Sequence, residues 1–176
     1  DLAKIDRLAD TAGPALTQRQ SWWHPKFQPV ACQTLADFDT LMGHEIAHAL
    51  LRHGAQRMAQ QKVAQIGQMG AGMAGMDAGS QQMVQAAMGY GMLLPYARSH
   101  ETQADEVGLM LAAAACFDPR EAVPLWERMS EASGGQAPPE FSSTHPNPGT
   151  RIQNLSALMP TALEYQKKFC TTPPAQ

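Results

Sequence analysis

Residues 43–48 read Gly-His-Glu-Ile-Ala-His, and this stretch decides the fold prediction. On an α-helix, residues four apart lie on the same face one turn apart, so His44 and His48 point in one direction. Two imidazoles placed in this way can bind one Zn²⁺ at ~2.0–2.1 Å. Glu45 lies about 100° further round the helix, where it can accept a proton from a zinc-bound water. The stretch therefore predicts a helix that carries a zinc site and its general base.

A catalytic zinc site also needs a third protein ligand and an open fourth position. Glu101 and Asp105 are four residues apart, so they lie on one face of a later predicted helix. We predict that Glu101 is the third ligand. Asp105, one turn on, can accept the free N–H of His44 or His48 and so fix the orientation of that ring.

Other histidines are poorer candidates for the third ligand. His53 follows His44 by nine residues, about 180° round the same predicted helix, and we expect it to face away. His100 is rotated off the face that carries Glu101. A third histidine ten residues after the first is absent, because residue 54 is Gly.

The composition predicts a mainly helical protein. The 176 residues fit one domain with a hydrophobic core, and they include 28 Ala, 17 Gln and 11 Met against five Val and four Ile. With 13 Lys and Arg against 16 Asp and Glu, the net charge of −3 argues against a nucleic-acid-binding surface. No apolar run approaches the ~18 residues of a transmembrane helix.

Hydrophobic periodicity places helices between breaks at Gly and Pro. We expect a short amphipathic helix before Gly13, an irregular segment over residues 18–34, and one continuous helix over residues 35–57. Residues 67–80 are rich in Gly and Met and predict a mobile helical hairpin or loop, with methionines in adaptable packing. Helical structure is expected again over residues 81–116, interrupted at its proline.

The last third of the chain should begin with a capped helix. Asp118 is a predicted N-cap, and Pro124 should bend that helix or delay its start. Residues 133–149 are predicted to form a long loop. A helix follows from residue 152, and we expect Pro160 to break it and a shorter helix to run on to the last cysteine.

We expect residues 1–176 to form one catalytic domain, with an N-terminal segment over 1–34, the zinc-site helices over 35–132 and a loop with C-terminal helices over 133–176. The sequence begins at Asp1 without a signal peptide, which predicts a processed or trimmed chain.

The cysteines form no CxxC pair, which argues against a cysteine zinc site. They are either isolated buried thiols or include one disulfide, Cys116–Cys170, with Cys32 left over.

Taken together, these motifs resemble the HtpX-like zinc endopeptidases related to the CAAX prenyl proteases. The resemblance covers about residues 35–158, and it rests on GHEIAHALLRH (43–53), YARSHETQAD (96–105) with Gly108, FDP (117–119), and STHP (143–146) with Arg151 and Ile152. It implies a gluzincin with a zincin-like, mainly α fold and at most a small antiparallel sheet near the N-terminal part. It also implies His44, His48 and Glu101 as metal ligands and Glu45 as the general base.

The resemblance suggests further roles and a location. In some relatives the histidine of the STHP-like motif caps the zinc in a latent state, so His145 is either a removable fourth ligand, a donor to the tetrahedral oxyanion, or a solvent-facing loop residue. For Arg151 we expect one of three roles: it anchors that loop, contacts the oxyanion or forms a surface salt bridge. Soluble relatives predict a bacterial periplasmic protein, either free or associated with the outer membrane as a peripheral protein or lipoprotein.

One departure from the family concerns the cleft edge. The family has an NAF-x-x-PGG-like turn and an edge strand before the HExxH helix, and that strand normally holds the substrate backbone. Residues 22–34 are too short for it and lack PGG. We expect that the chain is trimmed there or that a segment is missing before residue 35.

The predicted function is zinc-dependent endopeptidase activity, with one Zn²⁺ per chain and misfolded or envelope proteins as substrates. The alternative is a chaperone-like module, in which the Met- and Gly-rich hairpin holds unfolded clients and the zinc is structural. A third hypothesis is a purely structural helical bundle. Glu45 favours the enzyme, because a structural zinc site needs no base. Neither the cleavage specificity nor the oligomeric state follows from the sequence.

Overall fold

The computed structural model describes residues 35–132 and 139–170. Within these ranges every regular element is a helix and there is no strand, which confirms the mainly helical prediction. The elements are α2 (Leu35–Leu50), α3 (His53–Met73), α4 (Ala78–Met88), the π-helix η2 (Gly89–Leu93), α5 (Leu94–Ala114), η3 (Pro119–Glu121), α6 (Ala122–Ala132), η4 (Glu140–Ser142) and α7 (Pro148–Phe169). The predicted N-terminal helix, the segment 18–34 and the small sheet lie outside the described residues.

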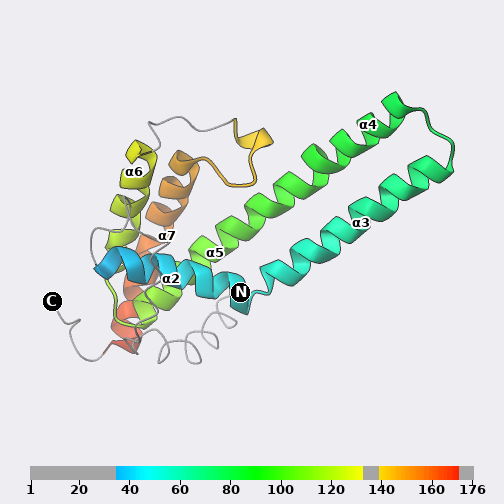
Figure 1. The fold of residues 1–176 in the computed structure, drawn as a ribbon. Helices are drawn as coiled ribbons and strands as arrows, with labels where there is room; N and C mark the ends of the chain where they lie inside the picture. Colours follow the sequence, from blue (N-terminus) through cyan, green and yellow to red (C-terminus); the bar gives the residue numbers. More distant parts are fainter. Residues whose placement is uncertain (1–34, 133–138, 171–176) are drawn as a thin grey trace.

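The helices form a packed body from which one hairpin projects (Figure 1). In the body, α2 crosses α5, α7 packs against α5, and α6 lies beside α7. Helices α3 and α4 run side by side as a long hairpin that leaves the body. None of the described helices is both long and apolar enough to cross a membrane.

Helix α5 supplies most of the core because its second half is an almost unbroken apolar run. Residues 107–115 read VGLMLAAAA, and each of them except Ala114 is buried. A helix that is apolar all round must be covered on several sides. Helices α2, α6 and α7 provide that cover, with the buried side chains of Ala47, Ala122, Leu125, Leu155, Ala162 and Tyr165.

Two glycines set the closest approach of α2 and α5. A Cβ at Gly43 would lie 2.7 Å from the carbonyl oxygen of Gly108, and a Cβ at Gly108 would lie 2.7 Å from the backbone nitrogen of His44. Only two residues without side chains allow the backbones to come this close. The crossing therefore brings the turn that carries the two histidines against the turn that carries Glu101.

The predicted continuous helix over residues 35–57 is wrong in one respect. Helix α2 ends at Leu50, and α3 starts at His53 after Arg52 adopts a left-handed conformation with φ 58°. The chain therefore turns between the two helices. A left-handed residue at this position ends a helix, and here it is an arginine rather than the usual glycine.

The predicted hairpin at residues 67–80 is present, with more helix than its glycine content indicates. Helix α3 continues to Met73, and Asp77 caps α4 by accepting a hydrogen bond from the Ser80 N–H. The methionines of this segment are exposed, so the expectation that they pack is wrong for the described chain.

The last third differs from the prediction at one proline. Asp118 caps η3 as expected, and α6 starts only at Ala122, so Pro124 falls in its first turn. Helix α7, however, runs through Pro160 without a break. Pro160 is exposed, while Leu155 and Ala162 on either side are buried, so core packing outweighs the lost hydrogen bond.

A disulfide joins the ends of two core helices. Cys116, which follows α5, is bonded to Cys170, which follows α7, with their Cα atoms 5.4 Å apart. This is one of the two cysteine arrangements that the sequence leaves open. Cys32 lies outside the described residues.

Candidate metal centre

Three side chains from α2 and α5 converge on one point. The Nε2 atoms of His44 and His48 are 3.0 Å apart, and the Glu101 carboxylate oxygens lie 3.4 Å from His48 Nε2 and 3.6 Å from His44 Nε2. Among the described residues, these are the ones that form a group able to hold a metal ion. The structure therefore brings together all three predicted ligands.

The spacing and the hydrogen bonds of the two rings both fit a zinc ion. Tetrahedral ligands at ~2.0–2.1 Å from zinc lie roughly 3.3 Å from each other, close to the observed separations. His44 donates from Nδ1 to Asp105 at 2.9 Å, and the Nδ1 of His48 lies 3.0 Å from that of His53. With both Nδ1 atoms engaged, the Nε2 lone pairs face one point next to the Glu101 carboxylate. Three acceptors around one point suit a cation.

His53 is the residue that sequence reasoning placed wrongly. A continuous helix would turn it away from His44, but the break at Arg52 returns it to the site. Its Nε2 lies 3.4 Å from the Gln103 side-chain oxygen, so Nδ1 is left to accept a hydrogen bond from His48. The only sequence signal was a third histidine within ten residues. His100 was expected to lie off the ligand face. Its ring stacks on that of His53, with 4.1 Å between the ring centroids, and it is not in the metal group.

Arg151 is buried against the acidic side of the site. Its guanidinium donates two hydrogen bonds to Asp105, and Nη1 lies 3.6 Å from Glu101. The guanidinium carbon also lies 3.5 Å from the ring centre of Trp126. Arg151 is only 4% exposed, so the surface salt bridge considered from the sequence is not formed. Its contacts hold Asp105, which in turn orients His44.

The charges of these groups are strongly coupled. Burial alone lowers the pKa of His44, but its contacts with Asp105 and Glu101 prevail and raise that pKa from 6.5 to about 9. Burial alone raises the pKa of Glu101, yet contacts with His44 and His145 lower it from 4.5 to about 2. Burial and the neighbouring His44 lower the pKa of His48. Without a metal, a proton on His44 thus provides the positive charge that this centre needs.

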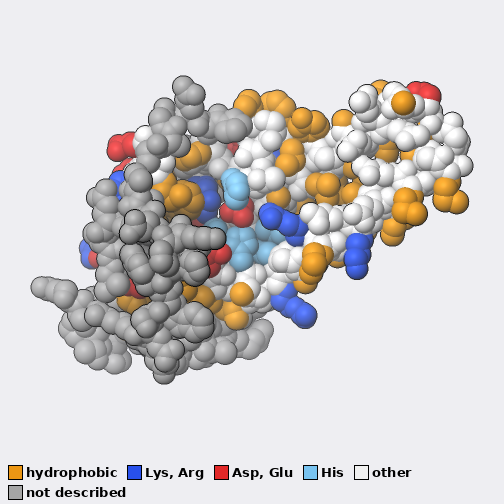
Figure 2. Space-filling view, in the orientation of Figure 1, with side chains coloured by type: hydrophobic (Ala, Val, Ile, Leu, Met, Phe, Trp, Pro, Cys, Tyr) orange, Lys and Arg blue, Asp and Glu red, His pale blue; other side chains and the backbone are white. Residues whose placement is uncertain are grey.

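The metal group opens into a cleft of about 420 Å³. Figure 2 shows histidine side chains exposed at the centre of one face, next to acidic and basic side chains. Glu45 lines this cleft and is exposed, as its position on the helix predicts. The arrangement can hold a metal at the base of a cleft and keep a carboxylate free beside it.

His145 reaches the same cleft from the segment between η4 and α7. Its Nδ1 lies 3.1 Å from Glu101, while its side chain remains 60% exposed. It is not part of the metal group. Arg98 holds this segment by donating to the backbone carbonyls of Glu140 and Ser143. His145 therefore lies at the rim of the cleft, within reach of the metal centre.

The relatives found by comparison with known proteins include several that are named as metalloendopeptidases or proteases. The chain is 42% identical over 125 residues to mitochondrial metalloendopeptidase OMA1 of Schizosaccharomyces pombe, which covers 69% of this chain and 36% of that protein. It is 34% identical to the human mitochondrial OMA1 metalloendopeptidase over 76% of this chain and 28% of that protein. A more distant relative is the beta-barrel assembly-enhancing protease of Escherichia coli, 28% identical over 64% of this chain and 25% of that protein. The chain thus spans less than half the length of these relatives.

These relatives correct the predicted location. The proteins at 34–42% identity are named as mitochondrial, so the prediction of a bacterial periplasmic protein is wrong. The physical reason is that the zinc-site residues encode local chemistry, which is the same in every compartment. They carry no information about where a chain is delivered.

The sequence profile of peptidase family M48 matches residues 30–159, and no solved structure matches. The match covers the candidate ligands, Glu45 and His145, and includes most of the described helices. It confirms the metallopeptidase prediction at the level of the family and does not favour the chaperone-like alternative; the finer HtpX-like and CAAX-related features are not tested. The chain belongs to peptidase family M48, a family of zinc-dependent metallopeptidases.

Proposed function

We propose that this chain is a zinc endopeptidase that hydrolyses peptide bonds in proteins. The observation that carries the proposal is the convergence of His44, His48 and Glu101 at the base of an open cleft, with Glu45 exposed beside them. A structural zinc site is closed by four protein ligands, whereas a catalytic site keeps one position open. One Zn²⁺ per chain, held by these three residues, is part of the proposal.

A zinc ion held by His44, His48 and Glu101 would supply Lewis-acid chemistry, polarising the scissile carbonyl and lowering the pKa of a bound water. Glu45 accepts the proton of the attacking water and later delivers it to the leaving amine. Asp105 and His53 hold the two ring nitrogens that face away from the centre. Arg151 is a positioning residue, because it acts on the centre through its two hydrogen bonds to Asp105.

Two roles remain for His145, and both follow from its position at the rim. It either occupies the open metal position in a latent state or donates a hydrogen bond to the oxygen that gains negative charge. A His145→Ala variant should be more active than the wild type in the first case and less active in the second. Unchanged activity would exclude both roles.

We propose unfolded or misfolded proteins as the substrates, because they present an extended backbone that the cleft can hold. The resemblance to HtpX-like enzymes, through the STHP motif at residues 143–146 and Arg151, supports a place among the quality-control members of the family.

The decisive experiment compares Glu45→Gln with Glu127→Gln on an unfolded protein substrate. Both glutamates are exposed, but Glu127 lies on α6 and lines no part of the cleft. We expect Glu45→Gln to lower the cleavage rate by about 10²- to 10⁴-fold and Glu127→Gln to leave it unchanged. Metal analysis of both variants should still give one zinc per chain. Wild-type cleavage by Glu45→Gln would exclude the proposed base.

A further inference from the structure

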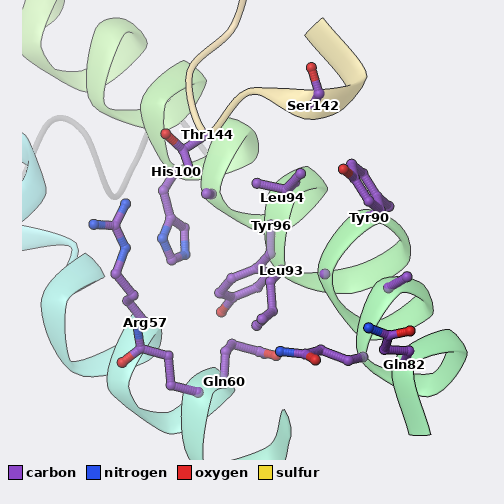
Figure 3. A pocket seen from close by; sticks show the side chains of 15 residues that line it. Arg57, Gln60, Gln82, Tyr90, Leu93, Leu94, Tyr96, His100, Ser142 and Thr144 are labelled. Atoms are coloured by element: carbon purple, nitrogen blue, oxygen red, sulfur yellow. The ribbon is translucent and has the colours of Figure 1, made fainter. Parts of the chain in front are cut away.

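A second cavity lies directly beside the metal cleft. It has a volume of about 590 Å³ and lies between α3 on one side and α4, η2 and α5 on the other (Figure 3). Arg57, His100 and Thr144 line both this cavity and the metal cleft, so the two spaces share a wall. We call it the hairpin pocket; its distinctive lining residues are Gln60, Ala86, Tyr90, Leu93, Leu94 and Tyr96.

The exposed surface of the hairpin pocket is mostly apolar, although its lining residues include four glutamines as well as Arg57, His100, Ser142 and Thr144. Figure 3 shows Leu93 and Tyr96 between the helices, with Gln60 and Gln82 along one edge. Among the described residues that line it, Arg57 is the only one of the Lys, Arg, Asp and Glu type. An apolar cavity with a few polar groups at its edge is typical of a site that binds an uncharged group. A lysine or arginine side chain would be desolvated there next to Arg57.

A glycine in a π-helix forms part of the wall of this pocket. Its wall includes the π-helix η2, and short π-helical segments within α-helices occur frequently at functional sites. Gly89 begins this segment and lines the pocket, and a Cβ at that position would meet no atom within 4 Å. Among the described residues, no side chain therefore fills the space in front of Gly89.

We propose that the hairpin pocket binds a bulky apolar side chain of the peptide substrate and thereby selects the bond that is cleaved. The inference rests on the proposed endopeptidase function and adds the substrate class. The volume exceeds that of one side chain, so it also accommodates flanking backbone. The glutamine amides at the edge have both donors and acceptors, which can pair with the backbone of an extended peptide.

A binding experiment tests the pocket without turnover. The zinc-loaded Glu45→Gln protein is titrated into fluorescein-labelled eight-residue Gly-Ser-Gln peptides that differ only in a central Phe, Leu, Ala or Lys, and anisotropy is measured. Because burying a large apolar side chain is favourable, we expect the Phe and Leu peptides to bind about tenfold more tightly than Ala, and Lys most weakly. Equal affinities for Phe, Ala and Lys would overturn the proposal.

Two tryptophan variants locate the effect. Ala86 and Ala87 are neighbours on α4 and both are exposed, but only Ala86 lines the pocket. Placed in the Glu45→Gln protein, Ala86→Trp should fill the pocket and remove the preference for Phe, whereas Ala87→Trp should keep it. Circular dichroism checks that both variants fold. Retention of the Phe preference by Ala86→Trp would also overturn the proposal.

Cleavage mapping separates this proposal from the function on which it rests. Active protein digests an unfolded substrate, and mass spectrometry should find bulky apolar residues enriched at one fixed position from the cut, about tenfold less so for Ala86→Trp. Cleavage without any such enrichment would overturn the pocket proposal alone. Absence of cleavage with a retained Phe preference in binding would overturn the endopeptidase function and leave the pocket in place.

Discussion

The crossing of α2 and α5 and the hairpin of α3 and α4 are built from similar residues in opposite environments. Met110, in the core half of α5, is 1% exposed, whereas Met73, at the end of α3, is 87% exposed. At the crossing, Gly108 touches the neighbouring backbone, while Gly70 in the hairpin has no atom within 4 Å of an added Cβ. The metal centre therefore lies on closely packed helices, whereas the adjacent pocket is bounded by a hairpin with exposed apolar side chains.

The largest effect is expected when the buried guanidinium of Arg151 is removed from the metal centre. Arg151→Leu leaves the buried Asp105 without its main partner, and we expect a loss of about 3–5 kcal/mol in the free energy of unfolding. Urea denaturation measures this change. Arg120→Leu is the control, because its pair with Asp118 is exposed and should be worth less than about 1 kcal/mol. Equal effects of the two substitutions would contradict the conclusion that the Arg151–Asp105 pair is buried and the Arg120–Asp118 pair is exposed.

A pH titration of the metal-free protein probes the same centre with a smaller effect. The pKa of His44 is raised from 6.5 to about 9, so between these values the folded protein binds more protons than the unfolded chain. The contribution of His44 to stability is therefore complete below pH 6.5 and is lost as the pH rises through about 9. We expect the stability of the wild type to fall over this window relative to that of His44→Ala.

Chelated samples of both proteins, unfolded in urea at pH 6.5 and at pH 9.5, provide the measurement. The zinc-loaded wild type is the control, because a bound metal replaces the proton and its affinity increases as competing protons are removed. Parallel pH profiles for the wild type and His44→Ala without metal would show that His44 does not titrate as described.

An alanine at the helix crossing tests the close approach directly. Gly108→Ala forces a Cβ to within 2.8 Å of Gly43 and of His44, and moving the helices apart should cost about 1–3 kcal/mol. It should also weaken zinc binding, because His44 lies on α2 and Glu101 on α5, and separating the two helices moves these ligands apart. Gly70→Ala is the matched control and should leave stability unchanged or raise it by up to about 1 kcal/mol. Calorimetric unfolding and zinc titration are the measurements.

The smallest effect is expected at the hairpin surface. Met73→Ala removes a side chain that is almost fully exposed, so the free energy of unfolding should change by less than about 0.5 kcal/mol. Met110→Ala, as the reference, should lose about 2–5 kcal/mol, because it leaves a cavity in the core. A large loss for Met73→Ala, measured by the same urea denaturation, would mean that the hairpin has packing partners in the folded protein.

Much of the metal centre could be predicted because its spacing is local. His44 with His48, and Glu101 with Asp105, are pairs four residues apart, and helical geometry alone places each pair on one face. The prediction for His53 failed because it assumed one helix, and neither Gly nor Pro marks the turn at Arg52. The prediction for Pro160 failed for the opposite reason. A proline usually breaks a helix, but here the burial of Leu155 and Ala162 on either side outweighs that tendency.

The sequence alone predicts the chemistry of the candidate site, the helical class and the ends of several helices, because these depend on residue types and short-range geometry. Three features are seen only in the folded molecule: α2 and α5 meet at Gly43 and Gly108, Arg151 is buried against Asp105, and the hairpin pocket adjoins the metal cleft. These features depend on which distant surfaces fit together when apolar area is buried. No short stretch of the chain specifies that fit alone.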